Sequence, residues 1–247
     1  MILVNIKTFK MKKGILAVTA IAFALSIQAC KKINGDGPVV TETRSLSGFS
    51  SINVGLSGNV YYNTGNEYKV EIHAQKNIVD AIETPVGDGE LKVHFDRHKI
   101  VGHHDPIDIY ITAPEVTAFD VNGSANVSVL QAVHPQNMDL NVSGSGSITI
   151  NELQTNYLHA KISGSGDVAV LGGSAQQEKT EISGSGNANL LNIPVHTAET
   201  HTSGSGTTKV NVSEKLDVHI SGSGDVYYKG NPTLSVSISG SGKVKPW

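Results

Sequence analysis

The sequence predicts an all-β protein that folds as a right-handed parallel β-helix, a single-stranded solenoid with about 18–21 residues per coil. Three observations predict this fold. The tetrapeptide Ser-Gly-Ser-Gly occurs six times, starting at residues 143, 163, 183, 203, 221 and 239, and such a fixed period is the signature of a repeat architecture. Apolar and polar residues alternate on both sides of every copy, as they do in β-strands. The composition is rich in Gly, Ser, Thr, Val and Ile, which favours strands and turns over helices.

Stacking of the repeats follows from their length. One repeat cannot bury its own apolar face, whereas stacked repeats can, because the strands of each coil pair in parallel with those of the next. Parallel crossovers strongly favour the right hand. The 18-residue steps also suit a left-handed helix of six-residue repeats, although the sequence shows no six-residue periodicity.

The glycines of the motif mark a predicted sharp bend. Val142, Gly144, Gly146 and Ile148 are all even-numbered, so the inward face runs through the motif with glycine where side chains would point in. Only glycine allows such a close backbone approach, or a positive φ, at little cost. The predicted turn glycines are Gly144, Gly146, Gly164, Gly166, Gly184, Gly186, Gly204, Gly206, Gly222, Gly224, Gly240 and Gly242.

Residues 41–247 are predicted to form a single solenoid domain. Its residues 116–247 carry the Ser-Gly-Ser-Gly repeats, and its residues 41–115 form irregular N-terminal coils with further alternating segments. Residues 77–83 are compatible with one or two turns of helix. The atypical sequence of the N-terminal coils suits a cap, which solenoids need at their ends.

The N-terminus predicts export. Four lysines precede an apolar run at residues 15–27, and Gln28, Ala29 and Cys30 follow. This pattern is typical of a secretory signal peptide, predicted here at residues 1–29, and translation from Met11 would leave it intact. The apolar run is shorter than the roughly 20 residues that a membrane-spanning helix needs.

Cys30 is the only cysteine, and its setting resembles a bacterial lipobox. That resemblance implies a lipid on Cys30, with residues 30–40 as a lipidated linker and the protein exported and lipid-anchored in the cell envelope, at the outer membrane. Acyl chains hold a protein to a membrane without a spanning helix. The alternative is an ordinary signal peptide followed by a free cysteine.

Charge excludes one class of partner. Without residues 1–29, which hold four lysines and no acidic residue, the 22 Asp and Glu residues outnumber the 15 Lys and Arg residues. The sequence shows no basic patch of the kind that nucleic-acid binding needs. We therefore expect no nucleic-acid partner.

Several segments together resemble the putative auto-transporter adhesin, head GIN domain family of Bacteroidetes-type bacteria. The resemblance covers essentially all of residues 31–247 and rests on four features: Ile33-Asn34-Gly35 after the cysteine, Arg44-x-Leu46-x-Gly48-Phe49-x-x-Ile52, Ile109-x-Ile111-x-Ala113-Pro114, and the Ser-Gly-Ser-Gly copies. It implies a pectin-lyase-like β-helix and a role in adhesion. It carries over no catalytic residues.

The densest polar cluster is a candidate metal site made of His94, Asp96, His98, His103 and His104. The first three share one face of an extended chain, and a hairpin would bring the two others across, giving ligands that suit zinc or copper. The competing interpretation is a solvated hairpin tip, because Leu91 and Val93 on the same strand face inward. We favour the second interpretation and predict no cofactor.

Stacking also predicts an outward column of Asn141, Lys161, Glu181, His201, His219 and Ser237. The row Glu181, His201 and His219 is a conceivable acid–base or metal site. The alternative is an exposed face with a Lys161–Glu181 ion pair, which we favour. Calcium is disfavoured, because only Asp167 and Asp225 are acidic among the six equivalent positions after the motif.

These observations predict a non-catalytic adhesion or surface-binding protein for a glycan, an envelope polymer or another protein. One alternative is a carbohydrate-active enzyme of the β-helix type, but Arg44 and Arg97 are the only arginines and lie outside the repeats. Another is a structural, self-associating envelope protein. We expect a monomer or a small homo-oligomer, with Trp247 either folded over the last coil as a lid or placed with Tyr228 in an interface.

The anchor is testable by substitution. Cys30→Ala is expected to release the protein from membranes, because the only residue able to carry the acyl chains is lost. Metabolic labelling with a palmitate analogue, followed by membrane fractionation, measures the effect. Labelling that persists in the variant would contradict lipidation at Cys30.

Overall fold

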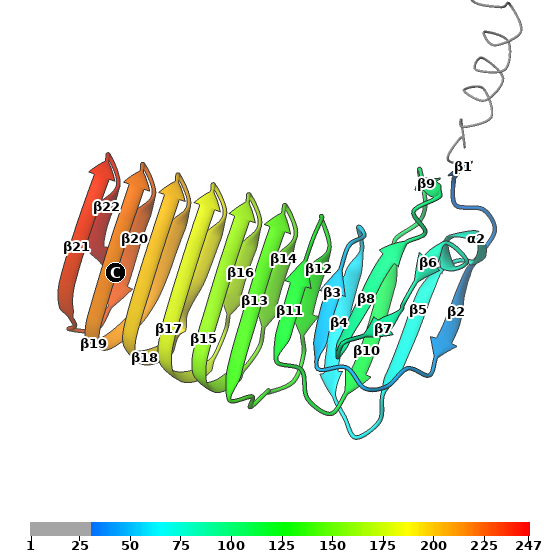
Figure 1. Cartoon of the computed structure of the whole chain (residues 1–247), viewed down its shortest axis with the longest axis horizontal. Helices are drawn as coiled ribbons and strands as arrows, with labels where there is room; N and C mark the ends of the chain where they lie inside the picture. The colour runs from blue at the N-terminus through cyan, green and yellow to red at the C-terminus, as the bar shows by residue number, and fades with distance from the viewer. Residues whose placement is uncertain (1–30) are drawn as a thin grey trace, which may run out of the picture.

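The computed structural model describes residues 31–247 as one elongated β-solenoid of about 6 turns (Figure 1), which confirms the predicted all-β solenoid. The predicted signal peptide and Cys30 lie outside the described residues. Successive coils stack side by side along the long axis. Within the described part, no helix is long and apolar enough to cross a membrane.

Each coil of the repeat region has a long strand before the Ser-Gly-Ser-Gly motif and a short strand after it. Long strands pair in parallel with long strands, and short strands with short strands, so that two ladders run along the molecule. β18 and β19 each run through a short strand and the next long strand. The strands are β11 (Ala118–Val121), β12 (Asn126–Val129), β13 (Asn137–Gly144), β14 (Ser147–Ile150), β15 (Leu153–Gly164), β16 (Asp167–Val170), β17 (Gly173–Gly184), β18 (Asn187–Gly204), β19 (Thr207–Gly222), β20 (Asp225–Lys229), β21 (Thr233–Gly240) and β22 (Lys243–Pro246).

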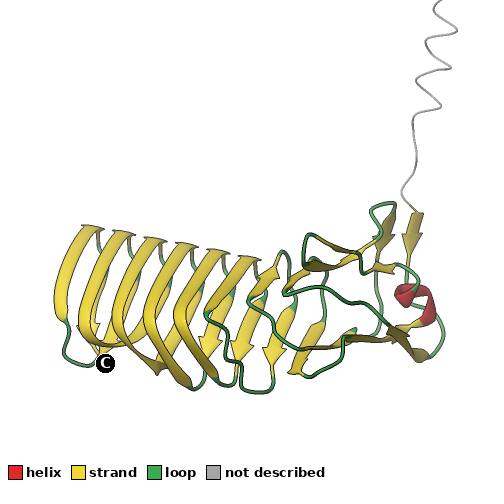
Figure 2. Ribbon diagram, turned by 60° about the horizontal axis from the view of Figure 1, so that its bottom comes forward, coloured by secondary structure: helices red, strands yellow, loops and turns green. Residues whose placement is uncertain are grey.

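The N-terminal part is a cap with its own pairing (Figure 2). Its helix, α2 (Lys76–Val79), is a single turn. Its strands are β1 (Lys31–Ile33), β2 (Val39–Arg44), β3 (Ser51–Val54), β4 (Asn59–Thr64), β5 (Lys69–Gln75), β6 (Ile82–Glu83), β7 (Val86–Gly87), β8 (Glu90–Phe95), β9 (Lys99–Val101) and β10 (Asp108–Ala113).

The cap does not stack in sequence order. β3 pairs in parallel with β8 on one side and β11 on the other, and β4 lies in the same way between β10 and β12. The coil that comes first in the sequence is therefore second in the stack. At the outer end of the cap the pairing becomes antiparallel, because β10 pairs with β5 and β5 pairs with β2 in this way. The cap therefore does not simply continue the parallel solenoid.

Most of the predicted linker at residues 30–40 belongs to this cap. β1 pairs in parallel with β9, and the backbone N–H of Gly35 donates to the carbonyl of His103 over 2.8 Å. β2 begins at Val39. The described chain is thus held in the cap from Lys31 onwards, directly after the predicted lipidation site.

Burial follows the predicted alternation. In β13, Met138, Leu140 and Val142 are fully buried while the residues between them face outward, and the same pattern recurs in the neighbouring coils. One core therefore runs through the stack as rows of Leu, Ile and Val. Removing such apolar surface from water is the main stabilising contribution, about 25 cal/mol per Å².

The two glycines of each motif are required for different reasons. The first adopts a positive φ, as at Gly164 (φ +133°), and an added Cβ would collide with the carbonyl oxygen of Gly144 in the preceding coil. The second, such as Gly166, has an ordinary φ but is buried, and an added Cβ would collide with the carbonyl oxygen of Gly146 and with the side chain of Val142. Both glycines thus lie against the backbone of the preceding coil, and of the two only the second is fully buried.

Two neighbouring coils have a polar interior. Glu178, Thr180, Thr200, Thr202 and Thr208 occupy inward positions and are buried. The Thr180 hydroxyl donates to Glu178 Oε1 over 2.9 Å, whereas Glu178 Oε2 and the hydroxyls of Thr200, Thr202 and Thr208 have no partner among the described residues. Burial raises the pKa of Glu178 to about 8, since desolvation disfavours the charged carboxylate.

The C-terminal coil is open. Leu234, Val236 and Ile238 of β21 occupy inward positions yet are 41%, 45% and 41% exposed. Trp247 does not cover them: it is 64% exposed and packs against Tyr227, an outward residue of β20. The predicted lid is therefore wrong for this structure.

Backbone stacking at the motif gives a stability prediction. Gly164→Val is expected to lower the free energy of unfolding by more than about 1 kcal/mol, because its Cβ meets backbone and its φ is unfavourable for L-residues. Ser165→Ala is the matched control, since Ser165 is exposed and should lose much less. Urea unfolding of both variants measures the difference, and equal losses would contradict the role given to the glycine.

The raised pKa of Glu178 predicts a pH dependence. Between the ordinary pKa of 4.5 and about 8, the folded protein keeps a proton that the unfolded chain releases. Stability therefore falls as pH rises through this window, by up to roughly 1.4 kcal/mol per pH unit. Urea midpoints at pH 5, 7 and 9 should decline in the natural chain and flatten in Glu178→Gln. An unchanged slope in that variant would mean that other groups cause the decline.

Candidate functional site

The outward face of the long strands carries straight columns of side chains. Because pairing is in register, residues 20 or 18 positions apart are direct neighbours, and the strands lie about 4.8 Å apart. The predicted column of Asn141, Lys161, Glu181, His201, His219 and Ser237 is formed, and we call it the mixed column. A parallel serine column contains Ser143, Ser163, Ser183, Ser203, Ser221 and Ser239.

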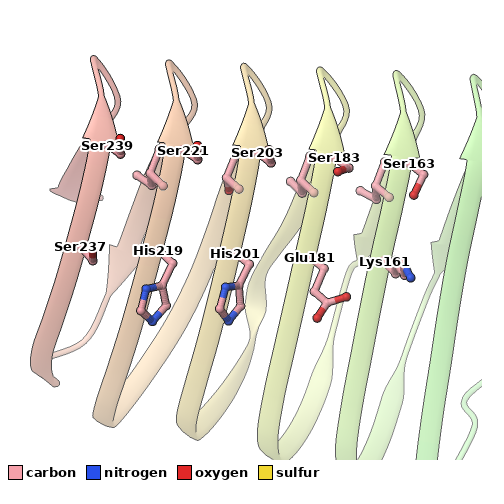
Figure 3. A pocket seen from close by; sticks show the side chains of 14 residues that line it. Lys161, Ser163, Glu181, Ser183, His201, Ser203, His219, Ser221, Ser237 and Ser239 are labelled. Atoms are coloured by element: carbon pink, nitrogen blue, oxygen red, sulfur yellow. The ribbon is translucent and has the colours of Figure 1, made fainter.

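A shallow hollow of about 710 Å³ lies along these two columns (Figure 3). It extends from Lys161 and Ser163 on β15 to Ser237 and Ser239 on β21, and so crosses five coils. Figure 3 shows the labelled serines in one row near the turn and the side chains from Lys161 to Ser237 in a second row. The hollow therefore presents hydroxyl, carboxylate, ammonium and imidazole groups at a regular repeat.

Two neighbouring imidazole rings lie on the third and fourth of the five coils, counted from Lys161. The rings of His201 and His219 stack with their centroids 4.7 Å apart and their planes 9° apart. His201 Nε2 is hydrogen-bonded to Glu199 Oε1, and this contact lowers the pKa of Glu199. The stacked pair is a flat aromatic surface bordered by hydroxyl groups.

The carboxylate of the hollow is engaged along its own strand. Lys179 Nζ lies 2.7 Å from Glu181 Oε1, and this hydrogen bond lowers the pKa of Glu181. His159 Nε2 lies 3.8 Å from Glu181 Oε2. The predicted Lys161–Glu181 ion pair is not formed within 4 Å among the described residues, so that prediction is wrong, although the two residues are register neighbours.

A second charged column, which the sequence analysis did not predict, is also present. It contains Asp139, His159, Lys179, Glu199, Asp217 and Ser235, and it runs beside the mixed column on the far side from the serines. The same 20- and 18-residue spacing, applied two residues upstream, would have found it. The burial of Glu178 was not predicted either, although the alternation along the strand places Glu178 on the inward face.

The proposed metal and acid–base sites do not assemble. Across residues 31–247, no group of three His, Cys, Asp or Glu side chains is placed to hold a metal ion. Glu181, His201 and His219 lie on three successive coils and do not converge on one point. The interpretation that remains for this column is an exposed polar face.

The histidines of the N-terminal cluster are dispersed. His94 Nδ1 lies 3.7 Å from Glu83 Oε2, His98 Nδ1 lies 3.1 Å from Asp96 Oδ1, and His104 Nδ1 is 2.6 Å from the carbonyl of Asp105. His103 is exposed. The alternative of a zinc or copper site at these residues is not supported. The predicted hairpin is not formed either, because β8 pairs with β3, β6 and β7, whereas β9 pairs with β1.

The two aspartates considered for calcium take part in side-chain ladders. Asp167 Oδ1 accepts from Asn187 Nδ2 over 2.8 Å, and Asp225 Oδ1 accepts the backbone N–H of Lys243 over 2.9 Å. Two coils separate them. Each carboxylate therefore accepts a hydrogen bond from the next coil, either from a side-chain amide or from a backbone N–H, and the two do not form a shared cation site.

Comparison with known proteins identifies the architecture. Residues 48–232 match the family described as "Putative auto-transporter adhesin, head GIN domain". The crystal structure of a putative adhesin from Bacteroides fragilis is similar with a TM-score of 0.83 and 29% sequence identity, covering 87% of this chain and 100% of that one.

Two Parabacteroides distasonis structures share the fold at lower identity. A putative adhesin has a TM-score of 0.72 and 22% identity, covering 88% of this chain and 100% of its own. A putative lipid binding protein has a TM-score of 0.71 and 23% identity, with the same coverage. No curated protein matches the chain.

Proposed function

The chain belongs to the putative auto-transporter adhesin, head GIN domain family, and we propose that it is a non-catalytic adhesion protein of the cell envelope. The observation that carries the proposal is the hollow along the serine and mixed columns. Its polar groups repeat from coil to coil over five coils. An extended polymer with its own repeating polar groups, such as a glycan or an envelope polymer, can match such a surface at several points at once.

The chemistry of the hollow supports binding over catalysis. Glycoside hydrolysis uses two carboxyl groups that flank the scissile bond. The hollow is lined by one carboxylate, Glu181, which is held by Lys179. The carbohydrate-active enzyme that the fold also suggests has no such pair in this hollow.

The adhesin description of the family supports an exported or cell-surface location. We further propose a signal peptide at residues 1–29 and a lipid on Cys30 that anchors the protein to the outer membrane. Lys31 follows Cys30 directly and belongs to β1 in the cap, and β21 lies at the other end of the solenoid (Figure 1). An anchor at Cys30 would therefore place the hollow's β21 end away from the membrane.

Self-association is a second candidate, favoured by the exposed apolar residues of β21. Its outer edge is an unpaired strand within the described chain, and such edges invite pairing with another chain. Sedimentation velocity over a concentration series tests this candidate. A mass increase that disappears in Val236→Glu would support a homo-oligomer, and a constant monomer mass would exclude it.

The binding role of the hollow can be measured with a glycan array. Residues 31–247 are expected to bind particular glycans, and His201→Ala with His219→Ala should weaken that binding about fivefold or more, as expected when about 1 kcal/mol of contact is lost. Thr149→Ala with Asn189→Ala is the matched control on the short-strand face and should bind normally.

Two outcomes would contradict this function. Unchanged binding by the histidine variant would remove the hollow from the site. Cleavage of a bound glycan, detected by mass spectrometry of the products, would show that the protein is an enzyme.

A further inference from the structure

A second surface lies on the short-strand face, at the C-terminal end of the solenoid. Tyr227 and Trp247 pack edge to face there, with ring centroids 5.8 Å apart. Lys209 Nζ lies 4.1 Å from the centroid of the Trp247 ring. The backbone N–H of Trp247 donates to the carbonyl of Tyr228 over 2.8 Å, so Trp247 continues the pairing of β22 with β20.

These residues belong to a flat array of outward positions on β19, β20 and β22. Register pairing places them in three short columns, which are Thr207, Asp225 and Lys243; Lys209, Tyr227 and Lys245; and Asn211, Lys229 and Trp247. We call this array the aromatic–lysine patch. It is separate from the hollow, which lies on the long-strand face.

The patch is basic although the chain as a whole is acidic. Four of its members are lysines, and Lys229, Lys243 and Lys245 are exposed. The acidic member of the patch is Asp225, whose Oδ1 accepts the backbone N–H of Lys243. The large exposed ring of Trp247 lies within this positive field. The patch therefore complements a ligand that carries negative charge and an apolar surface together.

We propose that the aromatic–lysine patch binds an acidic polysaccharide. The C–H faces of sugar rings pack against Trp247 and Tyr227, since aromatic rings offer large rigid surfaces with a polar edge. Carboxylates on the same polymer pair with the lysine ammonium groups. A repeating polymer suits the array, because its columns repeat from coil to coil about every 4.8 Å.

The position of the patch favours a polymer over a membrane surface. Tryptophan and lysine side chains also suit an anionic bilayer. The patch, however, lies on the last coils, at the end of the solenoid opposite to β1 (Figure 1). This step rests on the proposed function, because an anchor at Cys30 would hold the other end of the molecule at the membrane.

Polygalacturonate, neutral dextran and lipid vesicles distinguish these ligands. The full chain in detergent micelles is expected to bind polygalacturonate, with an affinity that falls as salt is added, and not dextran. Lys243→Ala with Lys245→Ala, and separately Trp247→Ala, should each weaken this binding by about tenfold or more. Thermal unfolding checks that these exposed substitutions leave the fold intact.

A control variant separates this site from the rest of the surface. Lys179→Ala with Lys215→Ala removes the same charge from the long-strand face and should leave polygalacturonate binding within about twofold. The glycan found on the array is measured separately with His201→Ala and His219→Ala, so a failure of the hollow as a binding site is distinguishable from a failure of the patch.

Two results would overturn the proposal: no binding to polygalacturonate, or equal losses in the lysine controls. If polygalacturonate does not bind, phosphatidylglycerol and phosphatidylcholine vesicles are compared, and the result that decides is tighter binding to phosphatidylglycerol. An acyl chain on Cys30 would insert equally into both vesicle types, so the difference between them reports only the effect of lipid charge. Tighter binding to phosphatidylglycerol would assign the patch to an anionic membrane surface.

Discussion

Backbone stacking at the Ser-Gly-Ser-Gly turn is the constraint on which the rest of the solenoid depends. The N–H of Ser165 donates to the carbonyl of Gly144 over 2.9 Å, and the N–H of Ser185 donates to that of Gly164 over 2.8 Å. This stacking leaves no room for a Cβ on the first glycine of the motif. Since every coil of the Ser-Gly-Ser-Gly region turns in the same way at the same place, the register between these coils is fixed, and a shift by one residue would turn the apolar rows outward.

A fixed register converts spacing in the sequence into neighbours in space. The turn is the same in every coil, whereas the outward positions between turns vary freely, from Lys161 to Glu181 to His201. The hollow and the aromatic–lysine patch are therefore made of side chains that contribute little to the fold. This separation explains how one solenoid carries a mixed, stacked-imidazole surface on its long strands and a basic, aromatic surface on its short strands.

Neighbouring residues could be predicted from the sequence where the Ser-Gly-Ser-Gly motif sets the register between coils. They could not be predicted where other contacts determine the position of a strand or a side chain. Adding 20 or 18 to a residue number gave the mixed column correctly. The stacking order of the cap could not be found in this way, because β3, β8 and β11 are joined by long-range pairing without a repeated motif. The partner of Glu181 was missed because Lys179, two residues along the same strand, competes with the cross-strand neighbour Lys161. Trp247 was misplaced because its position depends on packing with Lys209 and Tyr227.

The repeat shortens from 20 to 18 residues without interrupting the columns of outward side chains. In the pairing of β18 with β19, the short-strand segment is in regular register from Asn187 to Asn189. Regular register begins again in the long-strand segment, where Thr197 lies opposite Lys215. The register shifts fall between these segments, at residues 189–194 and 195–197. The two residues that the shorter coil lacks are therefore removed from the segment that joins the short strand to the next long strand. Both outward faces remain straight across the change, so a polymer lying along either face meets an uninterrupted series of columns.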